Sequence, residues 1–160
     1  MQINKTTKII VFITTCLAVG YFSSMATMSS VKTWFPTVTK PFFNPPSWVF
    51  GPVWSMLYVM MGVAAGLVWA KIDSNQEVVK KALLFFGIQL ALNALWSILF
   101  FGLQNPFLAL IEIVLLWLLI FETFSQFKKI DKIAGFLLLP YLAWVGFASI
   151  LNGSIWWLNR

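Results

Sequence analysis

Histidine is absent from this chain of 160 residues, cysteine occurs once, and only 10% of the residues are charged. Without histidine, the chain lacks the most common protein ligand of haem iron and a common ligand of zinc, so no metal site is expected. Catalysis by a Ser–His or Cys–His pair is excluded for the same reason. The single cysteine, Cys16, cannot form a disulfide within the chain, and we interpret it as a packing residue.

The scarcity of charge is matched by an excess of apolar residues. Hydrophobic residues make up 60% of the chain, and the mean hydropathy is +0.85. A soluble domain would carry roughly 25% charged residues, so the composition indicates an integral membrane protein. The net charge of +6 comes from basic residues at the ends of apolar segments. Basic flanks are typical of membrane segments, so no nucleic-acid partner is expected.

Five apolar segments are long enough to cross a bilayer, at residues 9–28, 48–70, 82–103, 107–127 and 133–157. The first follows Lys5 and Lys8 as in a signal peptide, but its length and the lack of a clear cleavage site favour a retained helix. Pro140 interrupts the last segment and predicts a kink. We therefore predict an all-α membrane protein, a five-transmembrane-helix bundle that forms a single domain over residues 1–160.

The longest predicted loop runs from Ser29 to Ser47 and is rich in aromatic residues. Such an apolar loop is not expected to extend into water, so we predict that it is structured and folds back on the bundle. In the second segment, Gly62 and Gly66 have the spacing that allows close helix approach. This spacing fits packing inside one bundle as well as it fits dimerisation.

Basic residues predict the orientation in the membrane, because they collect on the inner side. The N-terminus and the second and fourth loops carry eight of them: Lys5, Lys8, Lys71, Lys80, Lys81, Lys128, Lys129 and Lys132. The first and third loops and the C-terminus carry three: Lys32, Lys40 and Arg160. We expect the N-terminus inside and the C-terminus outside.

This topology places several polar and aromatic side chains at one depth in the outer half of the bundle. They are Trp54, Asn93, Trp96, Glu112 and Trp144, with Ala148 one turn above Trp144. We expect a pocket there, capped by the first loop. A carboxylate within a span is usually functional or turned toward a partner, and no basic residue lies in any span. Glu112 is therefore expected to be protonated or to meet neutral donors such as Asn93, Gln89, Tyr141 or tryptophan indoles, and the sequence leaves open whether it contacts a ligand.

Four stretches of the chain also carry a family resemblance. They are KPFFNPPSWVFGPVWSMLY from Lys40, QLALNALWSILFF from Gln89, ALIEIVLLW from Ala109 and LLPYLAWVGFASILN from Leu138. In this order they resemble the TspO/MBR family, which includes translocator proteins and tryptophan-rich sensory proteins, over residues 34–157. The resemblance implies a five-helix bundle, often dimeric, that binds porphyrins and hydrophobic drug-like ligands.

The resemblance also implies ligand contacts at the matching positions. The candidates for ligand binding are Trp34, Trp54, Asn93, Trp96, Glu112, Trp144 and Ala148. Trp54 and Trp144 match the tryptophans implicated in light-dependent porphyrin breakdown in some bacterial relatives, and they are the only candidates for a catalytic role. Ser47 stands where animal members have a histidine, Leu108 where they have a tryptophan, and Glu112 where the family has an aspartate. The C-terminal region lacks the tyrosine and basic residue of the sterol motif, so sterol recognition there is not expected.

We therefore expect a membrane receptor or sensor that binds protoporphyrin IX and other hydrophobic ligands and regulates tetrapyrrole handling. Two alternatives remain: a transporter of porphyrins or other apolar molecules, and an enzyme that degrades porphyrin under light. No cofactor is expected, and the absence of histidine favours free-base porphyrin over haem as the ligand. The expected partners are the ligand, the lipid bilayer and a second copy of the chain, in a bacterial cell-envelope membrane.

Overall fold

The computed structural model describes residues 3–160, in which all regular structure is helical. Five helical stretches are long and apolar enough to cross a membrane, which confirms the predicted fold class. The elements are α1 (Lys5–Thr33), η1 (Phe35–Thr37), α2 (Ser47–Ala70), α3 (Gln76–Ser97), η2 (Ile98–Gly102), α4 (Pro106–Ile130), α5 (Lys132–Leu137) and α6 (Leu139–Leu158). Helix η1 is a short 3₁₀ helix, and η2 is a π-helical turn at the end of α3.

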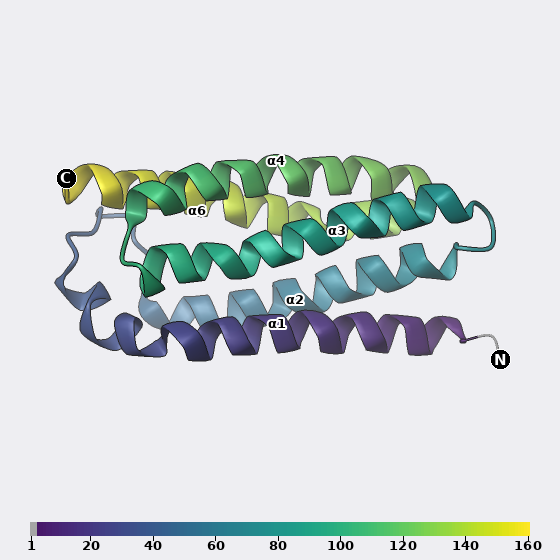
Figure 1. Ribbon diagram of the computed structural model, residues 1–160, viewed down its shortest axis with the longest axis horizontal. Coiled ribbons are helices and arrows are strands. Elements are labelled where there is room, and N and C mark those ends of the chain that lie inside the picture. The colour runs from purple at the N-terminus through teal and green to yellow at the C-terminus, as the bar shows by residue number, and fades with distance from the viewer. Residues whose placement is uncertain (1–2) are drawn as a thin grey trace.

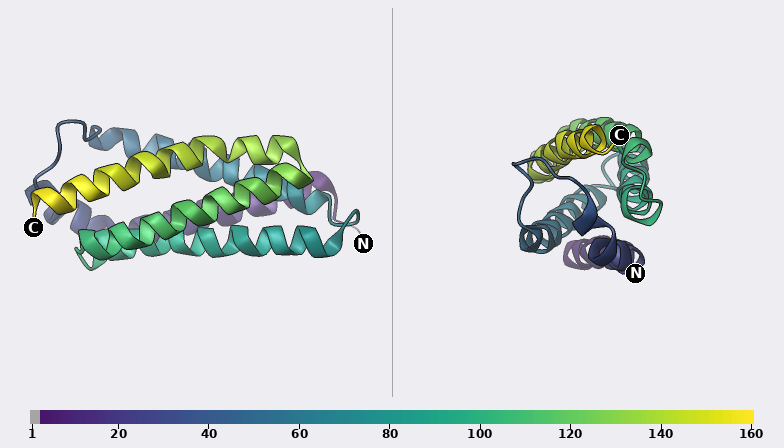
Figure 2. Two further views of the ribbon diagram at one scale, coloured as in Figure 1. Left: turned by 90° about the horizontal axis from the view of Figure 1, so that it is seen from above. Right: turned by 90° about the vertical axis from the view of Figure 1, so that its left-hand side faces the viewer.

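The helices form a ring when viewed from one end (Figure 2, right). Around the ring, α1 packs along α2, and α2 contacts α5 and α6. Helix α4 packs on α5 and α6, and α3 closes the ring between α4 and α1. The C-terminus and the first loop lie at one end of the bundle, and the N-terminus lies at the other (Figure 1). We call these the loop end and the N-terminal end.

Capping side chains start four of the helices. Asn4, Asn75, Asn105 and Asp131 each accept a hydrogen bond from the backbone N–H three residues later, at 2.8 to 3.2 Å. Each bond satisfies one of the donors that a helix start leaves free. Helix α2 begins without such a bond, directly after Pro46. Helix α3 begins at Gln76, before the predicted span of residues 82–103.

Helix α1 is longer than the predicted span of residues 9–28. It continues through Ser29 and ends at Thr33, so the prediction that the first loop begins at Ser29 is wrong. The hydroxyl of Thr27 donates to the carbonyl oxygen of Ser23 at 3.0 Å, and that of Thr33 donates to the carbonyl oxygen of Ser29 at 2.9 Å. Because these hydroxyls are satisfied within the helix, a polar composition does not end it.

The two closely spaced glycines of α2 face α1. A Cβ atom at Gly62 would overlap the backbone of Ile13, and one at Gly66 would overlap the backbone of Ile9. Only glycine therefore allows the two helices to approach this closely. Of the two uses that the sequence left open, the structure shows packing within one bundle.

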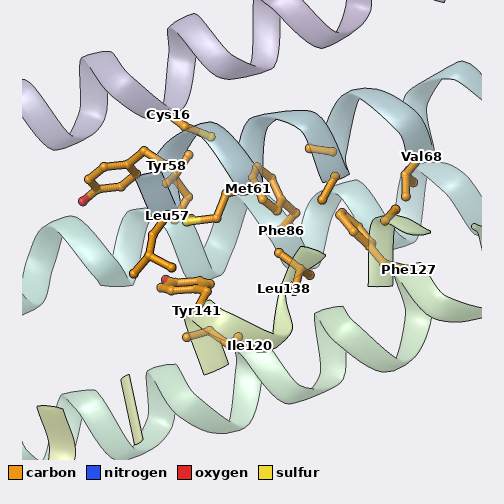
Figure 3. Packing of buried hydrophobic residues seen from close by; sticks show 14 of the residues in the cluster. Cys16, Leu57, Tyr58, Met61, Val68, Phe86, Ile120, Phe127, Leu138 and Tyr141 are labelled. Carbon is orange, nitrogen blue, oxygen red and sulfur yellow. The ribbon is translucent and has the colours of Figure 1, made fainter. Parts of the chain in front are cut away.

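Large apolar side chains fill the middle of the ring (Figure 3). Met61 of α2, Phe86 of α3 and Phe127 of α4 are fully buried. The rings of Phe86 and Phe127 stack with centroids 5.8 Å apart. Tyr141 of α6 is buried in the same cluster, so the core holds four spans in fixed relative positions.

Two of the spans are irregular. The fifth is broken at Leu138, with Pro140 in the first turn of α6, which confirms the predicted interruption, since proline has no N–H to continue the ladder. The third ends in the π-helical turn η2, where the Leu103 N–H donates to the Ile98 carbonyl oxygen at 2.8 Å. The sequence analysis did not predict this turn.

The first loop, residues 34–46, folds over the loop end of the bundle. The ring of Phe35 packs on Phe101 at 5.4 Å, and that of Phe43 packs on Phe147 at 6.3 Å. The side chain of Asn159, just beyond α6, forms hydrogen bonds with both backbone groups of Thr39. These contacts confirm that the loop is structured and docked on the helices.

Candidate functional site

A chain of buried hydrogen bonds crosses the inside of the ring. The Tyr58 hydroxyl donates to Asn93 Oδ1 at 2.7 Å, and Asn93 Nδ2 donates to the Tyr141 hydroxyl at 3.0 Å. The Tyr141 hydroxyl in turn donates to Gln89 Oε1 at 2.7 Å. Polar groups inside a membrane bundle need such partners, so this chain links α2, α3 and α6. Asn93, a candidate ligand contact, is held by the protein itself.

A second polar chain lies nearer the loop end. The indole N–H of Trp96 donates to Asn152 Oδ1 at 3.0 Å, and Asn152 Nδ2 donates to the carbonyl oxygen of Pro106 at 2.8 Å. The Trp96 ring also stacks on Phe100 of the π-helical turn, with centroids 5.1 Å apart. The indole N–H of Trp96 is therefore already used, and only its apolar surface is left for a ligand.

Glu112 departs from this pattern of satisfied polar groups, as does the side-chain nitrogen of Gln89, which is buried without a partner in the described residues. The side chain of Glu112 is only 6% exposed, and within the described residues neither carboxyl oxygen has a hydrogen-bond partner. The expectation that Asn93, Gln89, Tyr141 or an indole would pair with it is wrong. Asn93 and Tyr141 are held by each other, whereas the Nε2 group of Gln89 stays unpaired and still does not donate to Glu112.

The tryptophans of α2 and α6 occupy different surroundings. Trp54 packs inside the ring, with its centroid 5.5 Å from that of Tyr58 and 6.3 Å from that of Tyr141. Trp144 packs on Phe50 at 6.0 Å and on Phe147 at 5.6 Å. Both are half-buried and border the main core cluster, so the two indoles are not equivalent.

An apolar groove between α2 and α6 exposes one of these indoles. Its volume is about 510 Å³, within the range of roughly 300–1,000 Å³ typical of small-molecule sites. The lining residues are Pro45, Val53, Met56, Leu57, Pro140, Ala143, Trp144 and Phe147. We call it the α2–α6 groove. Trp144 is the only candidate ligand contact that lines it, and Trp54 is not part of its wall.

The remaining candidates, Ala148 and Trp34, do not line this groove. Ala148 is half-buried against the main cluster. Trp34 belongs to a second cluster at the loop end, where its ring packs on Phe100 at 5.7 Å. Trp34 therefore fastens the start of the first loop to the bundle. The structure thus places the candidates at one end of the molecule but gives them different contacts.

Several residues of the site were missed by sequence reasoning. The hydrogen bond between Tyr58 and Asn93 joins residues 35 positions apart. The only sequence signal for it is that both are polar residues within apolar runs. Val53, Met56 and Phe147 line the α2–α6 groove. The sequence gives no sign that these residues line a groove, because apolar residues in a span are equally suited to face lipid.

The chain is similar to known proteins over most of its length. The model of the TspO/MBR family matches residues 12–158. The chain is 46% identical over 148 residues to the tryptophan-rich protein TspO of Chlorobaculum tepidum, which covers 90% of each chain. It is 45% identical over 152 residues to the protein of the same name from Archaeoglobus fulgidus, covering 95% of this chain and 97% of that one. It is 34% identical over 141 residues to the translocator protein of Sus scrofa, covering 88% and 83%.

Proposed function

The chain belongs to the TspO/MBR family, and on that premise we propose that it is a membrane receptor or sensor that binds porphyrins and other planar hydrophobic molecules. The observation that carries the proposal is the α2–α6 groove, with its apolar walls and the half-buried indole of Trp144. An indole face suits a flat aromatic ligand, since offset stacking adds to the gain from apolar burial. The physiological role proposed is regulation of tetrapyrrole handling.

In this proposal the ligand lies against Trp144 beneath the first loop. The walls formed by Val53, Met56 and Leu57 of α2 would cover one side of the ligand, and α6 would cover the other. Pro45 of the first loop lies at the edge of the groove, so the docked loop limits access from that end. Trp54, Asn93 and Trp96 would act mainly by fixing the shape of the site, because their contacts are already made within the protein.

Light-dependent porphyrin degradation is a second candidate function. It is favoured by the position of Trp144, whose indole would contact a porphyrin in the groove, where the porphyrin itself would absorb the light. Trp54 is less suited to direct contact, because it packs on Tyr58 and Tyr141 and does not line the groove. A transporter remains a third candidate.

The test is a titration of the purified protein with protoporphyrin IX in the dark, followed by illumination. A receptor gives saturable tryptophan quenching without product, and Trp144→Phe weakens the affinity while Trp48→Phe, at an exposed interfacial position, does not. A new absorbing species formed under light and abolished by Trp144→Phe would promote the enzymatic candidate. Porphyrin flux into sealed proteoliposomes above that of lipid controls would promote the transporter. Absence of saturable binding contradicts all three.

We also assign an orientation to the bundle. Eight basic residues lie toward the N-terminal end and three toward the loop end, so the positive-inside rule puts the N-terminus inside and the C-terminus outside. The membrane is proposed to be that of a bacterial cell envelope. A reporter fused after Arg160 that is active only outside the cytoplasm tests the orientation. A homodimer remains part of the proposal, although Gly62 and Gly66 are used within the bundle.

A further inference from the structure

A second groove lies at the loop end of the molecule, between the first loop and the last turns of α6. It has a volume of about 670 Å³ and is lined by residues 39–43 of the loop and by Ile150, Gly153, Ser154, Trp157 and Leu158 of α6. The packing of Phe43 on Phe147, at 6.3 Å between ring centroids, separates it from the α2–α6 groove. We call it the loop groove.

The walls of the loop groove are largely apolar and open to the surroundings. Phe42 is fully exposed, Ile150 is 65% exposed and Trp157 is 58% exposed. Phe42 lies in the first loop, and Ile150 and Trp157 lie in the last three turns of α6. Here hydrocarbon gives way to headgroups, and tryptophan is enriched at this boundary. A groove with these walls at this depth suits the upper part of an acyl chain.

One basic side chain lines this groove, and a second lies against the ring of a residue in its wall. Lys40 lines it directly, and the guanidinium of Arg160 lies over the ring of Trp157, 3.1 Å from its centroid. The ammonium of Lys40 donates to the carbonyl oxygen of Val38 at 2.9 Å and lies 4.6 Å from the centroid of the Phe35 ring. An ammonium has three donors, so Lys40 can still bind an anion.

Within the described residues, no exposed acidic side chain lies at the loop end to pair with Lys40 or Arg160. The chain has five acidic residues. Asp73, Glu77 and Asp131 lie in or beside the turns of the N-terminal end, Glu122 lies in the half of α4 nearest that end, and Glu112 is buried. An anionic group supplied by the membrane would therefore complement a site that the side chains of the protein leave positive.

We propose that the loop groove binds an anionic phospholipid, with an acyl chain along Ile150, Gly153 and Trp157 and the phosphate near Lys40 and Arg160. A zwitterionic lipid would also fill the apolar groove, but its own headgroup cation would lie near Lys40 and Arg160 and offset the attraction of its phosphate. Cations near a membrane surface favour anionic lipids, and here they are placed beside a groove that fits the chain of the same molecule. The site is distinct from the proposed porphyrin site, so either can exist without the other.

Trp157 reports on this site because it forms part of the groove wall. The protein, purified in detergent, is titrated with dibrominated phosphatidylglycerol and, separately, with dibrominated phosphatidylcholine, whose bromine atoms quench nearby tryptophans. The signal of Trp157 is the difference between the wild type and Trp157→Phe. We expect phosphatidylglycerol to quench this signal at a concentration at least tenfold lower than phosphatidylcholine.

Substitutions separate a specific site from general attraction. Lys40→Gln and Arg160→Gln should each weaken phosphatidylglycerol binding by about fivefold. Lys32→Gln removes a cation at the same end but outside the groove and should have little effect. Ser154→Phe, which fills the groove, should reduce quenching by both lipids. Equal quenching by the two lipids, or an equal loss with Lys32→Gln, overturns the proposal.

Discussion

The side chain of Asn159 holds Thr39 by both of its backbone groups. The Thr39 N–H donates to Asn159 Oδ1 at 3.0 Å, and Asn159 Nδ2 donates to the Thr39 carbonyl oxygen at 2.9 Å. The same amide also donates to the carbonyl oxygen of Ile155 at 2.7 Å. A residue near the end of the chain therefore fixes the loop that borders the proposed ligand site.

Asn159→Ala should loosen the first loop without unfolding the bundle. Loss of two hydrogen bonds of about 1 kcal/mol each should speed porphyrin release by roughly tenfold or more and raise hydrogen exchange at residues 38–41. Asn75→Ala, which removes a helix cap at the opposite end, is the matched control. Release rates that are equal in both variants would show that the loop does not limit access.

The buried chain through Asn93 predicts an order of stabilities. Tyr141→Phe leaves groups of both Asn93 and Gln89 without a partner, whereas Tyr58→Phe leaves only Asn93 Oδ1 unpaired. Tyr141→Phe should therefore lower the free energy of unfolding more, by about 1 kcal/mol relative to Tyr58→Phe. Unfolding in mixed micelles measures this difference. The reverse order would contradict the assigned network.

The close approach of α1 and α2 predicts a contrast between two glycines. Gly62→Leu should cost about 2–3 kcal/mol, because a side chain there must displace the backbone of Ile13. Gly87→Leu should be nearly neutral, since no other part of the described chain comes within 4 Å of a Cβ atom at that position. Thermal unfolding in detergent tests both variants. Equal tolerance would mean that the two helices do not pack as described.

The sequence predicted the elements well because membrane spans are long apolar runs. The interruption near Pro140 was predicted for the same kind of local reason, since proline removes a backbone donor. The end of α1 was not predicted, because the hydroxyls of Thr27 and Thr33 are satisfied inside the helix. Polarity alone thus gave the wrong boundary.

The sequence predicted where the candidate residues lie along the helices but not which residues they contact. Position along a span fixes the depth of a side chain, whereas its direction depends on which helices become neighbours. The pairing of Thr39 with Asn159 joins residues 120 positions apart, and no periodicity encodes it. For the same reason the sequence suggested partners for Glu112 that do not bond it in the folded chain, and Asn93 and Tyr141 instead bond each other.

The unpartnered carboxyl group of Glu112 predicts that its removal is tolerated. Glu112→Leu breaks no hydrogen bond in the described chain, so it should leave stability unchanged or raise it by about 1 kcal/mol. Asn152→Leu is the contrast, because it leaves the Trp96 N–H and the Pro106 carbonyl oxygen unpaired and should destabilise. If Glu112→Leu destabilises as much, the carboxyl group has a structural partner after all.

The central claim is that the α2–α6 groove receives the ligand, and filling the groove tests it most directly. Ala143 lines the groove and is exposed, so Ala143→Phe should block the site without disturbing the core. Ala91→Phe introduces the same ring at an exposed position on α3 and serves as the control. The dissociation constant for protoporphyrin IX should rise more than tenfold in Ala143→Phe and stay unchanged in Ala91→Phe. Equal affinity of both variants and the wild type would contradict the account.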